Sequence, residues 1–161
     1  QYASGDYLLL LNNDVEVRNG DWLTELLRPD KKALEDPAFF EESTILTMYT
    51  IAGAISALAN TDPISRISAE NTVDGEVQLG IADKVAVTIA VRNHHFTTIK
   101  APSRNPRATM EFASVALAHD LFSGTAATMN EMCKGNIRLR GMISMVDNIN
   151  RILDRVGKYL A

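Results

Sequence analysis

Apolar residues in the middle of the chain recur at every second position, which is the pattern of half-buried β-strands. Breaks at 82–84 and 92–94 have the length of hairpin turns, and a proline-bearing stretch, 100–107, makes the last connection. We therefore expect an antiparallel meander of about four strands. Its apolar positions are Val77, Leu79, Ile81, Val85, Val87, Ile89, Val91, Phe96, Thr98, Ala108, Met110 and Phe112.

An uncharged stretch, 43–61, precedes the meander and reads STILTMYTIAGAISALANT. Its length approaches the roughly 20 apolar residues that a membrane-spanning helix needs. Its Ser, Thr and Asn content, with Glu41 and Glu42 in front, favours a helix of a soluble protein instead. Such a helix lies deep in a core or lines a lipid-filled space, and the polar stretch 60–75 that follows is interpreted as turns. The apolar face of the helix consists of Ile45, Met48, Ala52, Ile55 and Ala59.

Two short helices are marked by N-capping and terminating residues after the meander. Ser114 is the expected N-cap of a helix that ends before Gly124, and Thr125 that of a helix that ends before Gly135. NIRLR, at 136–140, then alternates as a short strand, and a last helix runs to Leu160. The apolar positions of this last helix keep a period of 3.6; they are Met142, Met145, Val146, Ile149, Ile152, Leu153, Val156 and Tyr159.

The first residues, GDYLLLLNNDVEVRNGDWLTELL, resemble the donor-binding segment of family-2 glycosyltransferases. That resemblance implies a metal-ligand role for Asp14, whose carboxylate suits a hard cation. A buried strand ending in a polar turn, or a leucine-rich helix, explains the same residues. Only three residues precede Ser4, so we expect residues 1–36 to be a packing appendage without sugar chemistry and residues 37–161 to form the domain.

Composition describes an ordinary globular chain of 161 residues, 46% hydrophobic and 22% charged. A net charge of −4 gives no electrostatic reason to expect nucleic acid, and the one basic patch, KAPSRNPR at 100–107, is interpreted as a solvated loop. One cysteine excludes an internal disulfide framework and suits a reducing cytoplasm, where we expect the protein.

Catalytic and metal-binding patterns are missing from the sequence. Neighbours on a strand point to opposite faces, so His94 and His95 do not share a metal, and His119 has no ligand at a suitable spacing. Cys133 is expected to be a small buried apolar residue near a helix end. No G-x-S-x-G elbow and no glycine-rich phosphate loop occur. We therefore expect no enzyme, no cofactor and no metal.

The segment LFSGTAATMNEMCKGNIRLRG, followed by MISMVDNINRILDRVGKYL, resembles the sterol carrier protein type 2 family. RATMEFA, the strand before it, also fits, and the resemblance covers about Phe39 to Leu160. It implies an α+β fold in which helices pack on one face of a five-stranded sheet and enclose an apolar tunnel. The ligand it implies is a sterol, a fatty acid or an acyl-CoA.

Methionines are concentrated in this half of the chain, and their flexible side chains suit ligands of varied shape, although they also fill gaps in cores. A closed domain of the same fold with a structural or interaction role, and a glycosyltransferase fragment, remain alternatives. A peripheral membrane contact and a homodimer stay open as partners beside the lipid. The expected tunnel residues are Ile51, Ile55, Val87, Ile89, Met110, Phe112, Leu121, Phe122, Met129, Met132, Met142, Met145, Val146, Ile149 and Leu153.

Overall fold

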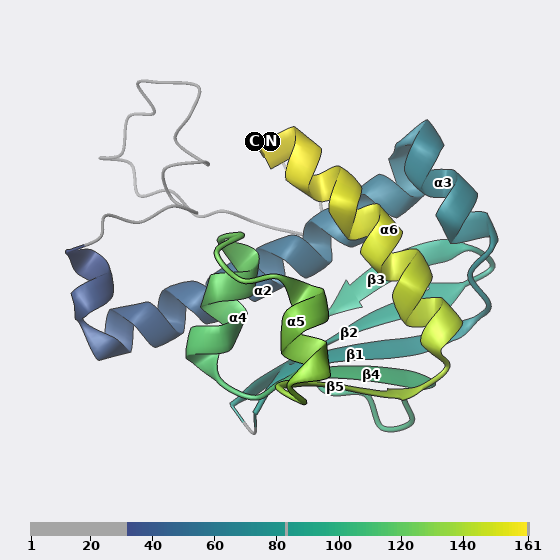
Figure 1. Ribbon diagram of the computed structural model, residues 1–161. Coiled ribbons are helices and arrows are strands. Elements are labelled where there is room, and N and C mark those ends of the chain that lie inside the picture. Colours follow the sequence, from purple (N-terminus) through teal and green to yellow (C-terminus); the bar gives the residue numbers. More distant parts are fainter. Residues whose placement is uncertain (1–31, 83, 161) are drawn as a thin grey trace.

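The computed structural model describes residues 32–82 and 84–160, and these form an α+β domain with helices packed on one face of a five-stranded sheet (Figure 1). The domain that we expected at 37–161 lies in this part except for residues 83 and 161, whereas Asp14 and the rest of the glycosyltransferase-like segment lie outside the described residues. The strands are β1 (Gly75–Ile81), β2 (Val85–Arg92), β3 (His95–Ile99), β4 (Ala108–Phe112) and β5 (Ile137–Gly141).

The period-two pattern locates all four central strands. At the turn between β1 and β2, the Lys84 amide donates to the Ile81 carbonyl at 2.9 Å. Between β2 and β3, Asn93 and His94 have φ angles of 50° and 60°, which a tight two-residue hairpin requires. The predicted hairpin turns are therefore confirmed.

The sheet is mixed, so the prediction of a purely antiparallel meander is wrong. Its strand order is β3-β2-β1-β4-β5, and β4 pairs with β1 in parallel. The connection 100–107 causes this, because it runs back across the sheet instead of closing a hairpin. Thr88 on β2 donates its hydroxyl proton to the Ala101 carbonyl, and the Ser103 amide donates to the Gln78 side chain on β1. The predicted solvated loop thus lies over the sheet.

The uncharged helix is confirmed, and it is longer than its apolar pattern. Asp36 caps it by accepting from the Ala38 amide at 3.0 Å, and Pro37 occupies the first turn. Of its predicted face, only Ile45 is half-buried rather than buried. The helical elements are η1 (Ala33–Glu35), α2 (Pro37–Thr61), α3 (Pro63–Glu70), α4 (Val115–Phe122), α5 (Thr128–Cys133) and α6 (Ile143–Leu160).

One helix, α3, lies where the sequence predicted turns. Asp62 ends α2 and caps α3, because its carboxylate accepts from both the amide and the hydroxyl of Ser65 at 2.8 Å. Asp62 followed by Pro63 is a helix-start signal that the polar composition of the stretch concealed.

The short C-terminal helices follow the predicted punctuation in part. Ser114 caps α4 by accepting from the Leu117 amide, and Gly124 and Gly135 have φ angles of 74° and 78° after their helices. Thr125 is not the N-cap of α5, since its hydroxyl donates to the Asp120 carbonyl at 3.0 Å. Ala127 occupies the cap position without a side-chain hydrogen bond.

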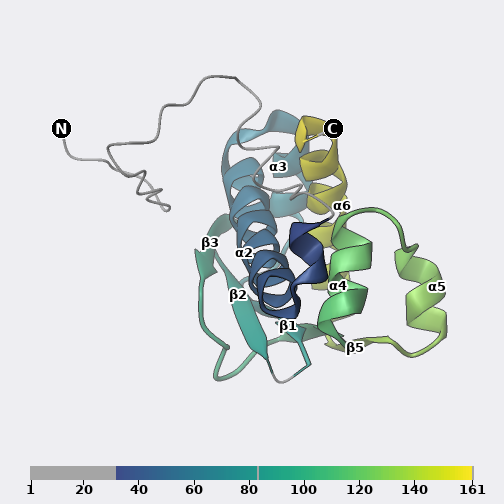
Figure 2. The ribbon, with the colours of Figure 1, turned by 90° about the vertical axis from the view of Figure 1, so that its left-hand side faces the viewer.

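The core lies between the sheet and helices α2 and α6, and Figure 2 shows the helices on one side of the strands. In the part of the chain that the structure describes, no helix has both the length and the apolar character that crossing a bilayer demands.

Candidate functional site

The inner face of the sheet is where eight of the predicted tunnel residues meet. They come from strands β2 and β4 and from helices α2 and α6, and each is at most 6% exposed. Because alternate residues of a strand face one side, the period-two pattern brings them together. These eight are Ile55, Val87, Ile89, Met110, Phe112, Met145, Val146 and Ile149.

A second group of predicted residues packs against this core without being fully covered. Leu121 and Phe122 end α4, Met132 belongs to α5, and Leu153 to α6. The ring of Phe122 meets that of Phe112 edge to face, with centroids 5.7 Å apart. Leu121, Phe122 and Met132, together with Leu139 on β5, define what we call the α5 edge, where the core is half-buried.

Helix α5 explains why this edge is open. It has no buried residue, and Met129 on its surface is 69% exposed. Figure 2 shows α5 standing at the outer side of α4, away from α2. Cys133 is exposed as well, so the expectation of a buried thiol is wrong, because α5 packs too lightly on the domain to bury it.

The carboxylate of Glu131 ties the end of α5 to β5. It accepts hydrogen bonds from Lys134 Nζ and from Asn136 Nδ2, each at 2.7 Å. The Lys134 and Asn136 hydrogen bonds lower the pKa of the Glu131 carboxyl below its ordinary 4.5. The last turn of α5 is therefore anchored by polar contacts, while its apolar side chains remain uncovered.

Two further predicted residues are not fully buried. Ile51 on α2 is half-buried and packs against the core, and Met142, just before α6, is 39% exposed. With Met129, Met142 is therefore a surface residue, and the structure does not place it among the side chains that fill the space between sheet and helices.

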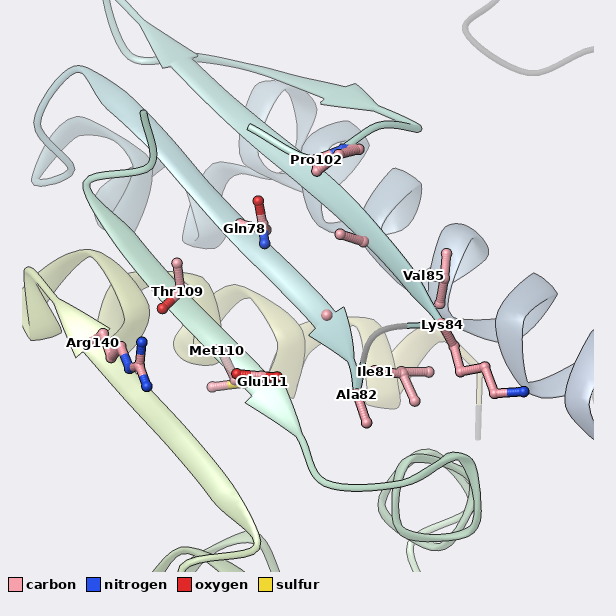
Figure 3. A pocket seen from close by; sticks show the side chains of 12 residues that line it. Gln78, Ile81, Ala82, Lys84, Val85, Pro102, Thr109, Met110, Glu111 and Arg140 are labelled. Atoms are coloured by element: carbon pink, nitrogen blue, oxygen red, sulfur yellow. The ribbon is translucent and has the colours of Figure 1, made fainter. Parts of the chain in front are cut away.

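Among the described residues, no helix covers the opposite face of the sheet, which holds a shallow hollow of about 460 Å³ (Figure 3). Small residues form its floor, notably Gly80 and Ala86, and Gln78, Glu111 and Arg140 stand around it. This hollow is polar at its rim and separated from the apolar core by the sheet, so it is not the predicted tunnel.

Comparison of the chain with known proteins gives a clear fold and no sequence relative. Neither a protein-family model nor a curated protein matches the chain. The solved sterol carrier protein domain 2 of Helicoverpa armigera superposes with a TM-score of 0.51 at 14% identity, over 70% of this chain and 87% of that one. The domain has the sterol carrier protein 2 fold.

Two more solved structures resemble the domain less closely. A Thermus thermophilus protein described as possibly a sterol carrier protein reaches a TM-score of 0.49 at 18% identity, over 70% of this chain and 87% of its own. A palmitated sterol-carrier-like protein of Aedes aegypti reaches 0.46 at 17% identity, over 65% and 91%. The comparisons give no support to the glycosyltransferase resemblance of the first residues.

Histidines take no part in the apolar site of this sterol carrier fold. His94 and His95 are exposed, and the ring of His119 packs against Phe40 with centroids 4.8 Å apart. Among residues 32–82 and 84–160, no three His, Cys, Asp or Glu side chains are grouped as a metal site.

Sequence reasoning missed two residues that adjoin the site, Leu117 on α4 and Leu139 on β5. Both are half-buried against the core. Leu139 had a signal, because it alternates with Ile137 in NIRLR, and Leu117 lies one helical turn before Leu121.

Proposed function

We propose that this domain binds a long-chain lipid between the inner face of its sheet and its helices, and that the ligand enters at the α5 edge. One observation supports this above all others: the apolar core continues outward into half-buried Leu121, Phe122 and Met132. Helix α5, which carries Met132 and borders the other two, buries no residue of its own. A ligand that moves α5 by a small amount would therefore contact apolar side chains that are already partly exposed at this edge.

The side chains at this edge favour an acyl chain or a sterol body. The core residues that continue inward from the edge, such as Met110 and Met145, are apolar as well, so affinity comes from removing hydrocarbon from water. Each buried methylene contributes about 0.8 kcal/mol. Met110, Met132 and Met145 have flexible, polarizable side chains that adapt to ligands of different shape. The name of the Helicoverpa protein, a sterol carrier, agrees with this chemistry.

A closed domain with a structural or interaction role is the second candidate. The central side chains favour it, because Val87, Ile89 and Val146 are at most 2% exposed. Such a core would have to rearrange before it admitted a long ligand, whereas a purely structural domain needs no opening.

Titration with a fluorescent long-chain fatty acid in vesicle-free solution separates the two candidates. The variant Met132→Arg places a charge in the entrance, and we expect it to weaken binding at least about tenfold, because desolvating an unpaired charge is unfavourable. The matched control is Ile67→Arg, since Ile67 is 62% exposed on α3, away from the α5 edge. Equal binding by both variants would place the ligand elsewhere, and no saturable binding by the natural sequence would favour the closed domain.

Mass spectrometry of an organic extract tests whether lipid is carried as cargo. We expect the purified protein to release a long-chain lipid that is recovered chemically unchanged after incubation, as for a carrier that performs no reaction. Release of a hydrolysed or otherwise converted product would overturn the carrier role.

A further inference from the structure

The helix-free face of the sheet carries a group of arginines beside exposed apolar side chains. We propose that this face docks on the surface of an anionic lipid bilayer. We call it the basic face and define it by Arg104, Arg107, Arg138 and Arg140, with Met142 at its margin. The proposal stands apart from ligand binding inside the domain, because it concerns the other side of the sheet.

Strand register places Arg138 and Arg140 on this face, and the connection 100–107, which lies over the same face, carries Arg104 and Arg107. On β5, Arg138 and Arg140 alternate with Ile137, which is buried in the core, so the two arginine side chains point to the other side. Arg140 pairs with Thr109 on β4, whose side chain stands on the face shown in Figure 3. The Met142 amide donates to the Arg107 carbonyl at 2.9 Å, so Met142 lies next to the end of the connection 100–107.

The charges of the basic face are largely unneutralised. Within the part of the chain that the structure describes, its four guanidinium groups make no ion pair and no hydrogen bond to side chains or backbone, and all four are exposed. The other exposed arginines of the described ranges are paired, as Arg66 is with Glu70 and Arg151 with Asp147.

Carboxylates on the same face offset this charge only in part, because Glu111 is the one that lies opposite an arginine of the basic face, Arg138, in the strand register. Glu76 is engaged by Arg92 at 3.1 Å and also accepts from the Ser103 hydroxyl, which leaves Glu111 as the nearest free counter-charge along β4. The chain as a whole carries a net charge of −4, so the basic face opposes the sign of the molecule. An anionic surface therefore attracts this face more than the rest of the molecule, and the protein approaches it with the basic face first.

The apolar margin favours a bilayer over other anionic partners. Met142 and Ile143 are 39% and 53% exposed immediately after Arg140 and Gly141. Proteins that bind at a membrane interface place guanidinium groups among the lipid headgroups and let apolar side chains reach the boundary of the acyl chains. Single-stranded nucleic acid instead stacks its bases on aromatic rings, and 100–107 and the outward positions of β4 and β5 hold none.

Vesicle co-sedimentation of the full chain tests the proposal. We expect binding to phosphatidylcholine vesicles that contain about 30% phosphatidylserine, little binding to pure phosphatidylcholine, and loss of binding as salt rises. The variant R138E/R140E should bind at least about tenfold more weakly, because each basic residue near an anionic surface contributes substantially to attraction. R138Q/R140Q, which adds no carboxylate beside Glu111, should show an intermediate loss.

The matched control is R66E/R151E, which changes the net charge equally at positions away from the basic face. It should keep its vesicle binding, and a thermal melt of each variant checks folding. An equal loss in the control and in R138E/R140E would overturn the proposal, as would failure of the natural chain to bind anionic vesicles. The proposal would also be overturned if the natural chain bound a short DNA duplex or an acidic peptide more tightly than anionic vesicles and R138E/R140E weakened that binding. The DNA or the peptide would then be the favoured partner.

Fatty-acid uptake in the absence of vesicles tests the proposed carrier role independently of membrane docking. Fatty-acid uptake without vesicles should be the same in R138E/R140E and in the natural chain, because the substituted side chains lie on the face of the sheet opposite the core. The variant Met142→Ser should reduce vesicle binding while its salt dependence stays unchanged, since it removes apolar contact and no charge. Unchanged binding by Met142→Ser would contradict insertion of the margin.

Discussion

The side-chain amide of Asn60 makes with Phe96 both hydrogen bonds that a neighbouring strand would make. Asn60 Nδ2 donates to the Phe96 carbonyl at 2.8 Å, and the Phe96 amide donates to Asn60 Oδ1 at 2.9 Å. Phe96 lies on β3, the first strand in the sheet order, so one face of α2 closes this edge at that residue. The contact fixes the helix against the sheet under which the apolar site is built.

Removing the Asn60 amide should therefore lower stability. In Asn60→Ala, two part-buried backbone groups of Phe96 lose their partners, and we expect the free energy of unfolding to fall by about 1–3 kcal/mol. Urea unfolding followed by circular dichroism measures it. Asn71→Ala is the control, because Asn71 Nδ2 bonds only the exposed Ile67 carbonyl and its removal should cost less than about 1 kcal/mol. Equal losses would show that Asn60 does not hold the β3 edge.

Asp62 should be the more important of two helix-capping aspartates. It is 7% exposed, caps α3 through Ser65, and lies 3.5 Å from the Arg155 guanidinium of α6. We expect Asp62→Ala to destabilise the domain by roughly 2–4 kcal/mol, because the cap and the partner of a part-buried arginine disappear together. Asp36→Ala, at the exposed cap of α2, should cost about 1 kcal/mol. Comparable denaturation midpoints for the two variants would contradict the joint role of Asp62.

Gly141 should tolerate no side chain. Its φ is 82°, and a Cβ there would lie inside contact distance of the Arg107 carbonyl oxygen, which is backbone and has little freedom to move. We expect Gly141→Ala to lower the free energy of unfolding by more than about 3 kcal/mol. Gly124 is the matched control, since its φ is 74° with open space around it, and Gly124→Ala should cost about 1–2 kcal/mol. A thermal melt of both variants decides the comparison.

Acid should loosen α5 before the rest of the domain. The pKa of Glu131 is lowered in the folded protein, so its contribution to stability is complete above the ordinary value of 4.5 and is lost as pH falls through the lower folded value. Below that pH the carboxyl no longer accepts from Lys134 and Asn136 as a charged group. Amide hydrogen exchange of 128–136 should rise in this range for the natural chain. Glu131→Gln should show the faster exchange already at neutral pH. Unchanged exchange in this variant would contradict the role of the Glu131 carboxylate in holding the end of α5.

Local patterns in the sequence predicted most of the elements. Alternation located β1 to β4, and the cap at Ser114 with glycines 124 and 135 bounded the C-terminal helices, because caps and turns act through neighbouring residues. The same alternation brought Val87, Ile89, Met110 and Phe112 to one face, since side-chain direction follows directly from strand geometry. The core of the candidate site was predictable for that reason.

Tertiary structure alone decided which strands became neighbours and which apolar residues were covered. Alternation says which face of β4 is apolar and says nothing of its partner, so only the path of 100–107 over Thr88 and Gln78 made the β1–β4 pairing parallel. Met129 and Cys133 are residue types common in cores, yet they are exposed, because burial requires a packing partner and their side of α5 has none among the described residues. The amino-acid sequence determined which faces of the strands and helices are apolar. The packing of these faces in the folded domain determined that the α5 edge is only half-buried.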